Sequence, residues 1–79
     1  MHENTIVTMR DYGSVRLKLR EQMQARNINR NALARSIGAR FEVVDKWYQG
    51  KVEKLDLDIL ARICCVLQCR IEDLLVYEE

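Results

Sequence analysis

Apolar residues recur three and four positions apart along most of the chain, which is the spacing of amphipathic helices. This pattern predicts helices over residues 19–26, 30–37, 41–49 and 57–67, and a shorter fifth helix over residues 71–76. The first four helices are expected to turn one apolar face toward a common core. The residues on those faces are Leu19, Met23, Leu33, Ala34, Ile37, Val44, Trp47, Leu60, Ile63, Cys64 and Leu67.

Residues that begin and end helices stand at the expected places. Asn29 and Asp56 directly precede two of the predicted helices, where their side chains can accept hydrogen bonds from free backbone amides. Gly38 and Gly50 directly follow two of them, and glycine tolerates the positive φ with which many helices end. These signals support the predicted helix boundaries.

The N-terminal part of the chain allows two interpretations. Residues 6–9 and 15–18 are both β-prone, and turn residues lie between them at 11–13, so the two runs could pair as a small hairpin. Alternatively, Ser14 could cap a helix that begins at Val15. In either case we expect an N-terminal extension over residues 1–13, followed by one domain over residues 14–77.

The segment 28–50 carries the most specific pattern. Leu33 and Ala34 lie in the first of its two helices, and Gly38 lies in the turn between them. Val44 and Trp47 follow in the second helix, on one face. A small residue lets the helices cross closely, a glycine permits the tight turn, and a branched residue packs back against the first helix. This is the spacing of a helix-turn-helix unit, here about residues 30–49, whose second helix can enter the major groove of DNA.

Over about residues 15–77 the chain resembles the Cro/cI-type helix-turn-helix domains of the Xre family of bacterial and phage regulators. The residues that carry the resemblance are Leu19, Met23, Leu33, Ala34, Gly38, Val44, residues 45–51, Leu57, Leu60, Ile63, Cys64, Leu67, Cys69 and residues 73–75. The resemblance implies an all-α fold, a compact lambda-repressor-like bundle of five helices. It also implies sequence-specific binding of double-stranded DNA by a transcriptional regulator, with a repressor as the expected kind.

The chain departs from the family pattern at two basic positions. Arg30 stands where the family often has Gln. Arg40 stands where the second helix often has a capping Ser or Thr, and the loss of such a cap costs about 1 kcal/mol. Arg40 in turn places a cation at the mouth of the groove.

Base contacts are expected from the N-terminal half of the predicted helix 41–49. Arg40 could pair with guanine, Phe41 could touch a thymine methyl group, and Glu42 could accept a hydrogen bond from cytosine. Asp45 and Lys46 complete the set, although Asp45 would repel nearby phosphates. Two alternatives stay open: Phe41 could pack against a neighbouring helix, and Glu42 could pair with Lys46 one helical turn away.

Phosphate contacts are expected at both ends of the helix-turn-helix unit. Asn29 and Arg30 lie at the start of the first helix, where backbone amides and the helix dipole attract anions. Gln49 and Lys51 flank the end of the second helix. Such contacts position a protein on DNA without reading its sequence.

The net charge of the 79-residue chain is only +1, which at first argues against nucleic acid. The charges are unevenly distributed, however. Residues 1–51 carry ten Lys and Arg against five Asp and Glu, or +5, whereas residues 52–79 carry three against seven, or −4. A protein with this separation can orient its basic part toward DNA.

Other classes of function find little support. A chain this short holds one small domain, and no stretch approaches the roughly 20 apolar residues of a membrane span. No histidine accompanies a nucleophile and no phosphate loop is present, so we expect no enzyme. Cys64, Cys65 and Cys69 lack metal-site spacing and are interpreted as small apolar helix residues in a reducing cytoplasm. We expect no metal, cofactor or small-molecule effector, and the N-terminus shows no export signal.

A DNA-binding domain of this size gains specificity when two copies bind together, so a homodimer is expected on a DNA operator. Two dimer surfaces remain open: the strand edge of an N-terminal hairpin, and the end of the chain with Leu75, Val76 and Tyr77. The alternative function is a protein-interaction module, such as the antitoxin partner of a toxin, in which DNA binding is secondary or absent.

Overall fold

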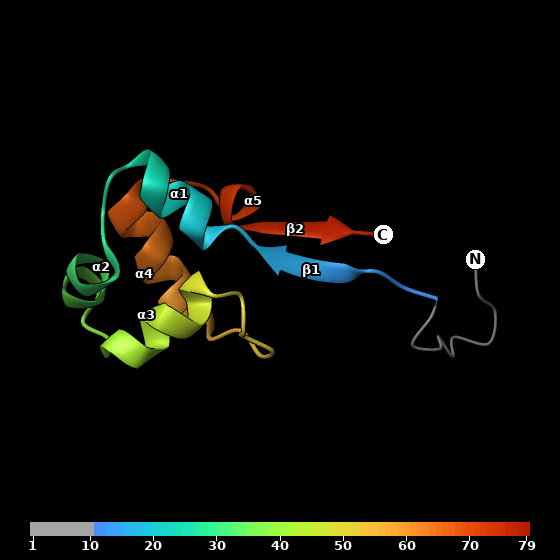
Figure 1. Cartoon of the computed structure of the whole chain (residues 1–79), viewed down its shortest axis with the longest axis horizontal. Helices are drawn as coiled ribbons and strands as arrows, with labels where there is room; N and C mark the ends of the chain where they lie inside the picture. The colour runs from blue at the N-terminus through green and yellow to red at the C-terminus, as the bar shows by residue number, and fades with distance from the viewer. Residues whose placement is uncertain (1–10) are drawn as a thin grey trace.

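The computed structural model describes residues 11–79, which form five helices and two short strands. Figure 1 shows the helices gathered into a bundle and the two strands projecting side by side from it. In chain order the elements are β1 (Ser14–Leu17), α1 (Leu19–Ala25), α2 (Arg30–Ile37), α3 (Phe41–Tyr48), α4 (Leu57–Leu67), α5 (Ile71–Leu74) and β2 (Leu75–Glu78). The five-helix expectation is confirmed, and a two-stranded antiparallel sheet is added to it.

One apolar core holds the helices together. Ten of the residues predicted to face it are buried, whereas Cys64 is only half-buried. Trp47 is 4% exposed and is therefore a core residue. Leu74 of α5 is fully buried as well and was not among the predicted core residues.

The predicted helix ends are largely confirmed. The Asn29 side chain accepts a hydrogen bond from the Ala32 amide at 2.8 Å, and Asp56 accepts two from the first turn of α4. Gly38 ends α2 with φ of 70°, a left-handed conformation that glycine adopts without strain. Helices α1 and α3 each end one residue earlier than predicted.

The prediction of a helix over residues 71–76 is wrong in its second half. Helix α5 ends at Leu74, and the chain then continues as strand β2. The reason is the pairing of β2 with β1, which places Val15 opposite Tyr77 and Leu17 opposite Leu75. All four of these side chains lie on one face of the sheet, so the apolar face of the core continues outward along the strands.

Of the two interpretations of the N-terminal segment, the helix is wrong, whereas the hairpin lies partly outside the described residues. No helix begins at Val15, because residues 14–17 form strand β1. Of the predicted hairpin, residues 6–9 lie outside the described residues, and β1 pairs with the C-terminal strand β2. We call the pair β1–β2 the ribbon.

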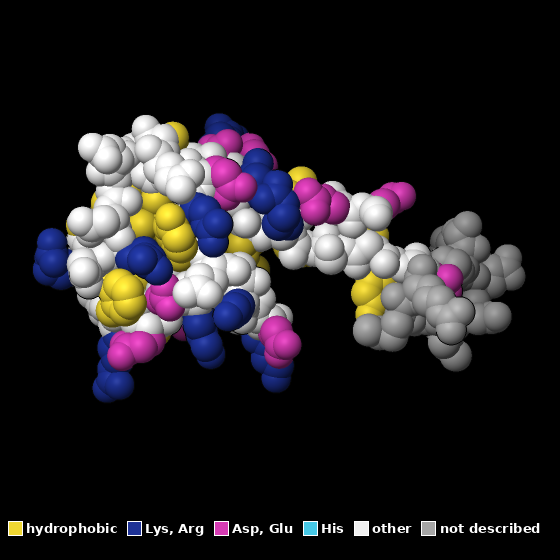
Figure 2. Space-filling model, in the orientation of Figure 1, with side chains coloured by type: hydrophobic (Ala, Val, Ile, Leu, Met, Phe, Trp, Pro, Cys, Tyr) yellow, Lys and Arg dark blue, Asp and Glu magenta, His cyan; other side chains and the backbone are white. Residues whose placement is uncertain are grey.

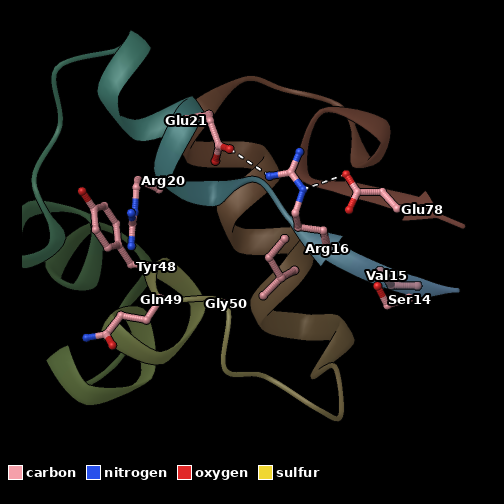
Figure 3. Close-up of a pocket in the computed structure, with 10 residues that line it drawn as sticks. Ser14, Val15, Arg16, Arg20, Glu21, Tyr48, Gln49, Gly50 and Glu78 are labelled. Carbon is pink, nitrogen blue, oxygen red and sulfur yellow. Dashed lines mark hydrogen bonds and ion pairs between the residues drawn. The ribbon is translucent and has the colours of Figure 1, made fainter.

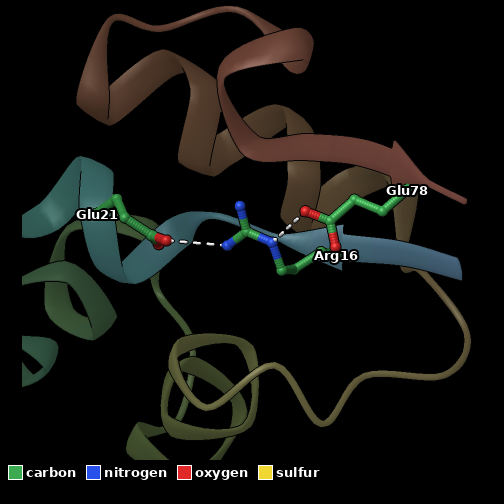
Figure 4. Close-up of polar contacts among 3 residues, drawn as sticks. All are labelled: Arg16, Glu21 and Glu78. Carbon is green, nitrogen blue, oxygen red and sulfur yellow. Dashed lines mark hydrogen bonds and ion pairs between the residues drawn. The ribbon is translucent and has the colours of Figure 1, made fainter.

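Polar contacts along the other face fasten the ribbon to the bundle. The Arg16 guanidinium lies 3.0 Å from Glu78 of β2 and 3.0 Å from Glu21 of α1 (Figure 4). At the outer end, the Gly13 amide donates to the Tyr77 hydroxyl at 2.9 Å. A Cβ at position 13 would lie only 1.8 Å from the Glu78 carbonyl oxygen, so this close approach requires glycine.

Candidate nucleic-acid interface

Helices α2 and α3 form the predicted helix-turn-helix unit. Ala34 is small and 5% exposed, and Leu33 and Val44 are fully buried between the helices and the core. The Arg62 side chain of α4 donates to the Ile37 carbonyl at 2.9 Å, which satisfies an acceptor that the end of α2 leaves free. The turn between the two helices is therefore fixed both by packing and by hydrogen bonding.

Helix α3 has a buried face and an exposed face. Val44 and Trp47 point into the core, whereas Arg40, Glu42 and Lys46 are exposed. The Arg40 side chain makes no capping hydrogen bond, so its guanidinium is not used to begin the helix. Figure 2 shows Lys and Arg side chains along the edge of the molecule formed by α3 and the loop after it.

The structure also places the remaining predicted base contacts. Phe41 is 40% exposed, so its packing against neighbouring helices is partial. Within residues 11–79 no ion pair joins Glu42 to Lys46, so the helical pairing considered for them is absent. Phe41, Glu42 and Lys46 therefore all offer accessible surface on α3.

Asp45 is held inside the unit. Its carboxylate lies 2.6 Å from the Arg30 guanidinium of α2 and accepts two hydrogen bonds from the Gln49 side chain, at 3.1 and 3.0 Å. The Gln49 hydrogen bonds, followed by Arg30, hold the pKa of Asp45 below its ordinary value. This carboxylate links α2 to α3, so the repulsion expected between Asp45 and DNA phosphates is offset by Arg30.

Arg30 lies between aromatic rings as well. Its guanidinium carbon is 5.6 Å from the centre of the Phe41 ring and 4.8 Å from that of Tyr48. On the same Tyr48 ring lies a second guanidinium, from Arg20 of α1, at 4.9 Å (Figure 3). Neither Arg20 nor Tyr48 was predicted as a site residue, because residues 28 positions apart meet only through the packing of α1 against α3.

The predicted phosphate contacts lie on either side of Tyr48. Asn29 and Arg30 line one shallow hollow beside the ring, and Gln49 lines another, next to Gly50. Lys51 is exposed just beyond. The structure thus brings the two ends of the helix-turn-helix unit to one surface, with Tyr48 between them.

Three further features of residues 11–79 concern metal ligands, cysteines and membrane spans. Residues 11–79 contain no group of three or more His, Cys, Asp or Glu side chains placed to hold a metal ion. Their three cysteines are free thiols, and burial raises the pKa of the Cys69 thiol. None of the helices among these residues has the length and apolar character to cross a membrane.

Solved structures share this fold. A candidate DNA-binding protein from Bacteroides fragilis superposes with a TM-score of 0.71 at 16% identity, covering 80% of this chain and 100% of its own. The transcriptional regulator VanUg superposes with a TM-score of 0.66 at 21% identity, covering 92% of this chain and 97% of its own. At these identities the likeness shows the fold alone. No curated protein matches the sequence.

The family model gives the more specific result. The model of the Cro/C1-type helix-turn-helix DNA-binding domain matches residues 18–79, which include all five helices and β2. The match agrees with the buried positions of α2 and α3 and with the left-handed glycine between them. The chain therefore belongs to the Cro/C1-type helix-turn-helix DNA-binding domain family.

Proposed function

We propose that this protein is a sequence-specific regulator of transcription that binds double-stranded DNA and acts as a repressor in the cytoplasm. The observation that carries the proposal is the exposed face of α3, where Arg40, Glu42 and Lys46 lie opposite a fully packed core face. In a Cro/C1-type domain this helix is the element that suits the major groove. Occupation of an operator would exclude the transcription machinery from the same DNA.

Each exposed side chain of α3 suits a different base. The Arg40 guanidinium, which has no partner within residues 11–79, suits O6 and N7 of guanine, and the Glu42 carboxylate suits N4 of cytosine. Phe41 offers a partly exposed ring to a thymine methyl group. Lys46 supplies a further donor one turn along. Asp45 contributes mainly by holding Gln49 and Arg30 in place, with its outer surface left for a base.

The backbone of the DNA is held at the two ends of the unit in this proposal. Asn29 and Arg30 bind the sugar-phosphate backbone on one side of Tyr48, and Gln49 and Lys51 bind it on the other side. The ion pair with Asp45 uses one nitrogen of Arg30. The Arg30 side chain stays 41% exposed, so its other N–H groups remain available for a phosphate.

A homodimer is part of the proposal, and the ribbon is its interface. The sequence offered two dimer surfaces, an N-terminal strand edge and the end of the chain. Because β1 pairs with the C-terminal strand β2, both belong to the ribbon. On the apolar face of the ribbon, Val15 is 63% exposed and Tyr77 is 57% exposed. A second copy would cover these side chains, and on an operator the two α3 helices would have to lie about 34 Å apart, the spacing of successive major grooves.

Two measurements test the proposal. In vitro selection from random DNA should yield a site with inverted repeats, and its affinity should fall steeply as salt rises. Arg40→Ala should relax the preference at one base pair, whereas Arg30→Ala should weaken all sequences alike. No binding at low salt, or the same binding profile for both variants, would contradict the assignment.

The apolar face of the ribbon also supports a second candidate, a protein-interaction module such as the antitoxin partner of a toxin. Val15 and Tyr77 would then be covered by a different protein. Sedimentation of the purified chain distinguishes the two: a dimer that Val15→Lys converts to a monomer supports the homodimer. A wild-type chain that stays monomeric at high concentration and binds no DNA supports the interaction module.

A further inference from the structure

We propose that Arg20, supported on the ring of Tyr48, is a DNA-phosphate contact that extends the interface from the helix-turn-helix unit onto α1. The proposal rests on the proposed DNA binding and adds a residue from outside α2 and α3. Arg20 is exposed, and its guanidinium carbon lies 4.9 Å from the centre of the Tyr48 ring (Figure 3).

The partners of the neighbouring charges single out Arg20. Of the two guanidinium groups on the Tyr48 ring, that of Arg30 is bound to Asp45, whereas Arg20 has no hydrogen bond or ion pair within residues 11–79. The hollow that contains Arg20 also contains two acidic residues, Glu21 and Glu78. Both of them form ion pairs with Arg16. Arg20 therefore has no direct ion-pair partner among the described residues, and only the longer-range attraction of Glu21 acts on its charge.

The Tyr48 ring makes this free cation a better ligand for phosphate. An arginine side chain has considerable rotational freedom, and binding an anion costs the entropy of fixing it. A guanidinium stacked on an aromatic ring is already oriented, and its edge keeps the N–H groups that match phosphate oxygens. Arg20 is therefore positioned before DNA arrives.

The position of Arg20 fits the path of a DNA strand. The Tyr48 ring separates the hollow that contains Asn29 and Arg30 from the hollow that contains Arg20 and Gln49. Arg20 thus stands beside both sets of proposed phosphate contacts. A phosphodiester strand that runs from Arg30 to Gln49 passes the Tyr48 ring and reaches the Arg20 guanidinium.

The test measures binding of the full chain to its selected DNA site over a salt series, for wild type and Arg20→Gln. Loss of one phosphate contact should reduce the slope of log affinity against log salt by about 0.9. The affinity ratio of wild type to variant should then shrink roughly 3.5-fold between 50 and 200 mM salt, and the loss should be equal on non-specific DNA. Arg70→Gln is the charge control, because it removes the same charge at the start of α5, away from α3 (Figure 1), where Arg70 pairs with Glu72.

Two tyrosine variants test the supporting ring. Tyr48→Phe keeps the aromatic face and should bind like wild type, whereas Tyr48→Leu should share the weakening of Arg20→Gln. Thermal melts establish that all variants fold. The proposal is overturned if Arg20→Gln keeps the wild-type slope or matches Arg70→Gln, or if Tyr48→Leu binds as well as Tyr48→Phe. Because wild type is measured in the same series, failure of DNA binding itself would appear separately as no binding by any protein.

Discussion

The helix-turn-helix unit joins residues close in the chain, whereas the ribbon joins residues 14–17 to residues 75–78. In the first, Leu33 and Val44 are fully buried, so the exposed face of α3 can vary without loss of the fold. In the second, the outer pair Val15 and Tyr77 is largely exposed, and few apolar contacts support it. Stability is therefore concentrated behind the proposed DNA-binding surface of α3, whereas the ribbon is a weakly supported extension suited to a partner.

The largest expected effect is in the core behind α2 and α3. Leu33→Ala should lower the free energy of unfolding by about 3 kcal/mol, because it leaves a cavity at a fully buried site. Leu57→Ala is the matched control, since Leu57 is 72% exposed, and it should change stability by less than about 0.5 kcal/mol. Urea unfolding followed by circular dichroism measures both. Similar losses for the two variants would mean that stability does not reside behind the unit.

The ribbon should respond locally. Gly13→Ala forces a methyl group against the Glu78 carbonyl, so the strands must separate at that end, at a cost of about 1–3 kcal/mol. Hydrogen exchange should become faster in β1 and β2 and stay unchanged in α2 and α3. Equal acceleration in α2 and α3 would show that the ribbon and the unit unfold together, against the comparison.

A smaller effect is expected at the start of α3. Arg40→Ser supplies the missing side-chain cap and should stabilise the protein by about 1 kcal/mol. The same change removes the proposed guanine contact and should weaken binding to the selected site. Asn29→Ala, which removes an existing cap from α2, is the opposite control and should destabilise by about 1 kcal/mol. An Arg40→Ser variant that is more stable and binds as tightly as wild type would leave Arg40 without a reading role.

The smallest effect concerns the link between α2 and α3. Hydrogen bonds from Gln49, followed by the Arg30 pair, lower the pKa of Asp45 in the folded state. The charged form therefore stabilises the fold above the unfolded pKa of about 3.9, and this contribution is lost as the pH falls through the lowered value. Wild type should exceed Asp45→Asn in stability at pH 6, and the difference should shrink below about pH 4. A difference that is constant with pH would mean that the carboxylate charge contributes nothing to the link.

The helices were predictable because their signals are local. Helices α2 and α4 match the predicted ranges to the residue, since Asn29 and Asp56 cap their starts and apolar residues recur at helical spacing. Strand β2 was not predictable in this way. Its pairing depends on β1, some 60 residues away in the register, and nothing near Val76 encodes that partner.

The candidate site also contains features that the sequence predicts and features that it does not. Which residues of α3 are exposed followed from the buried spacing of Val44 and Trp47. The Asp45–Gln49 hydrogen bond follows a helical spacing that sequence reasoning could have found. The stacking of Arg20 and Arg30 on Tyr48 could not be foreseen, because it depends on how α1 and α2 lie against the end of α3.

The central claim is that α3 enters the major groove of an operator. The most direct measurement is a methylation footprint with dimethyl sulfate on the selected DNA, since the reagent marks N7 of guanine in the major groove. If two α3 helices enter the major groove, guanines should be protected in two segments about 10 base pairs apart on one face of the duplex. Protection only at adenine N3, in the minor groove, or unchanged methylation of a fully bound site, would contradict it.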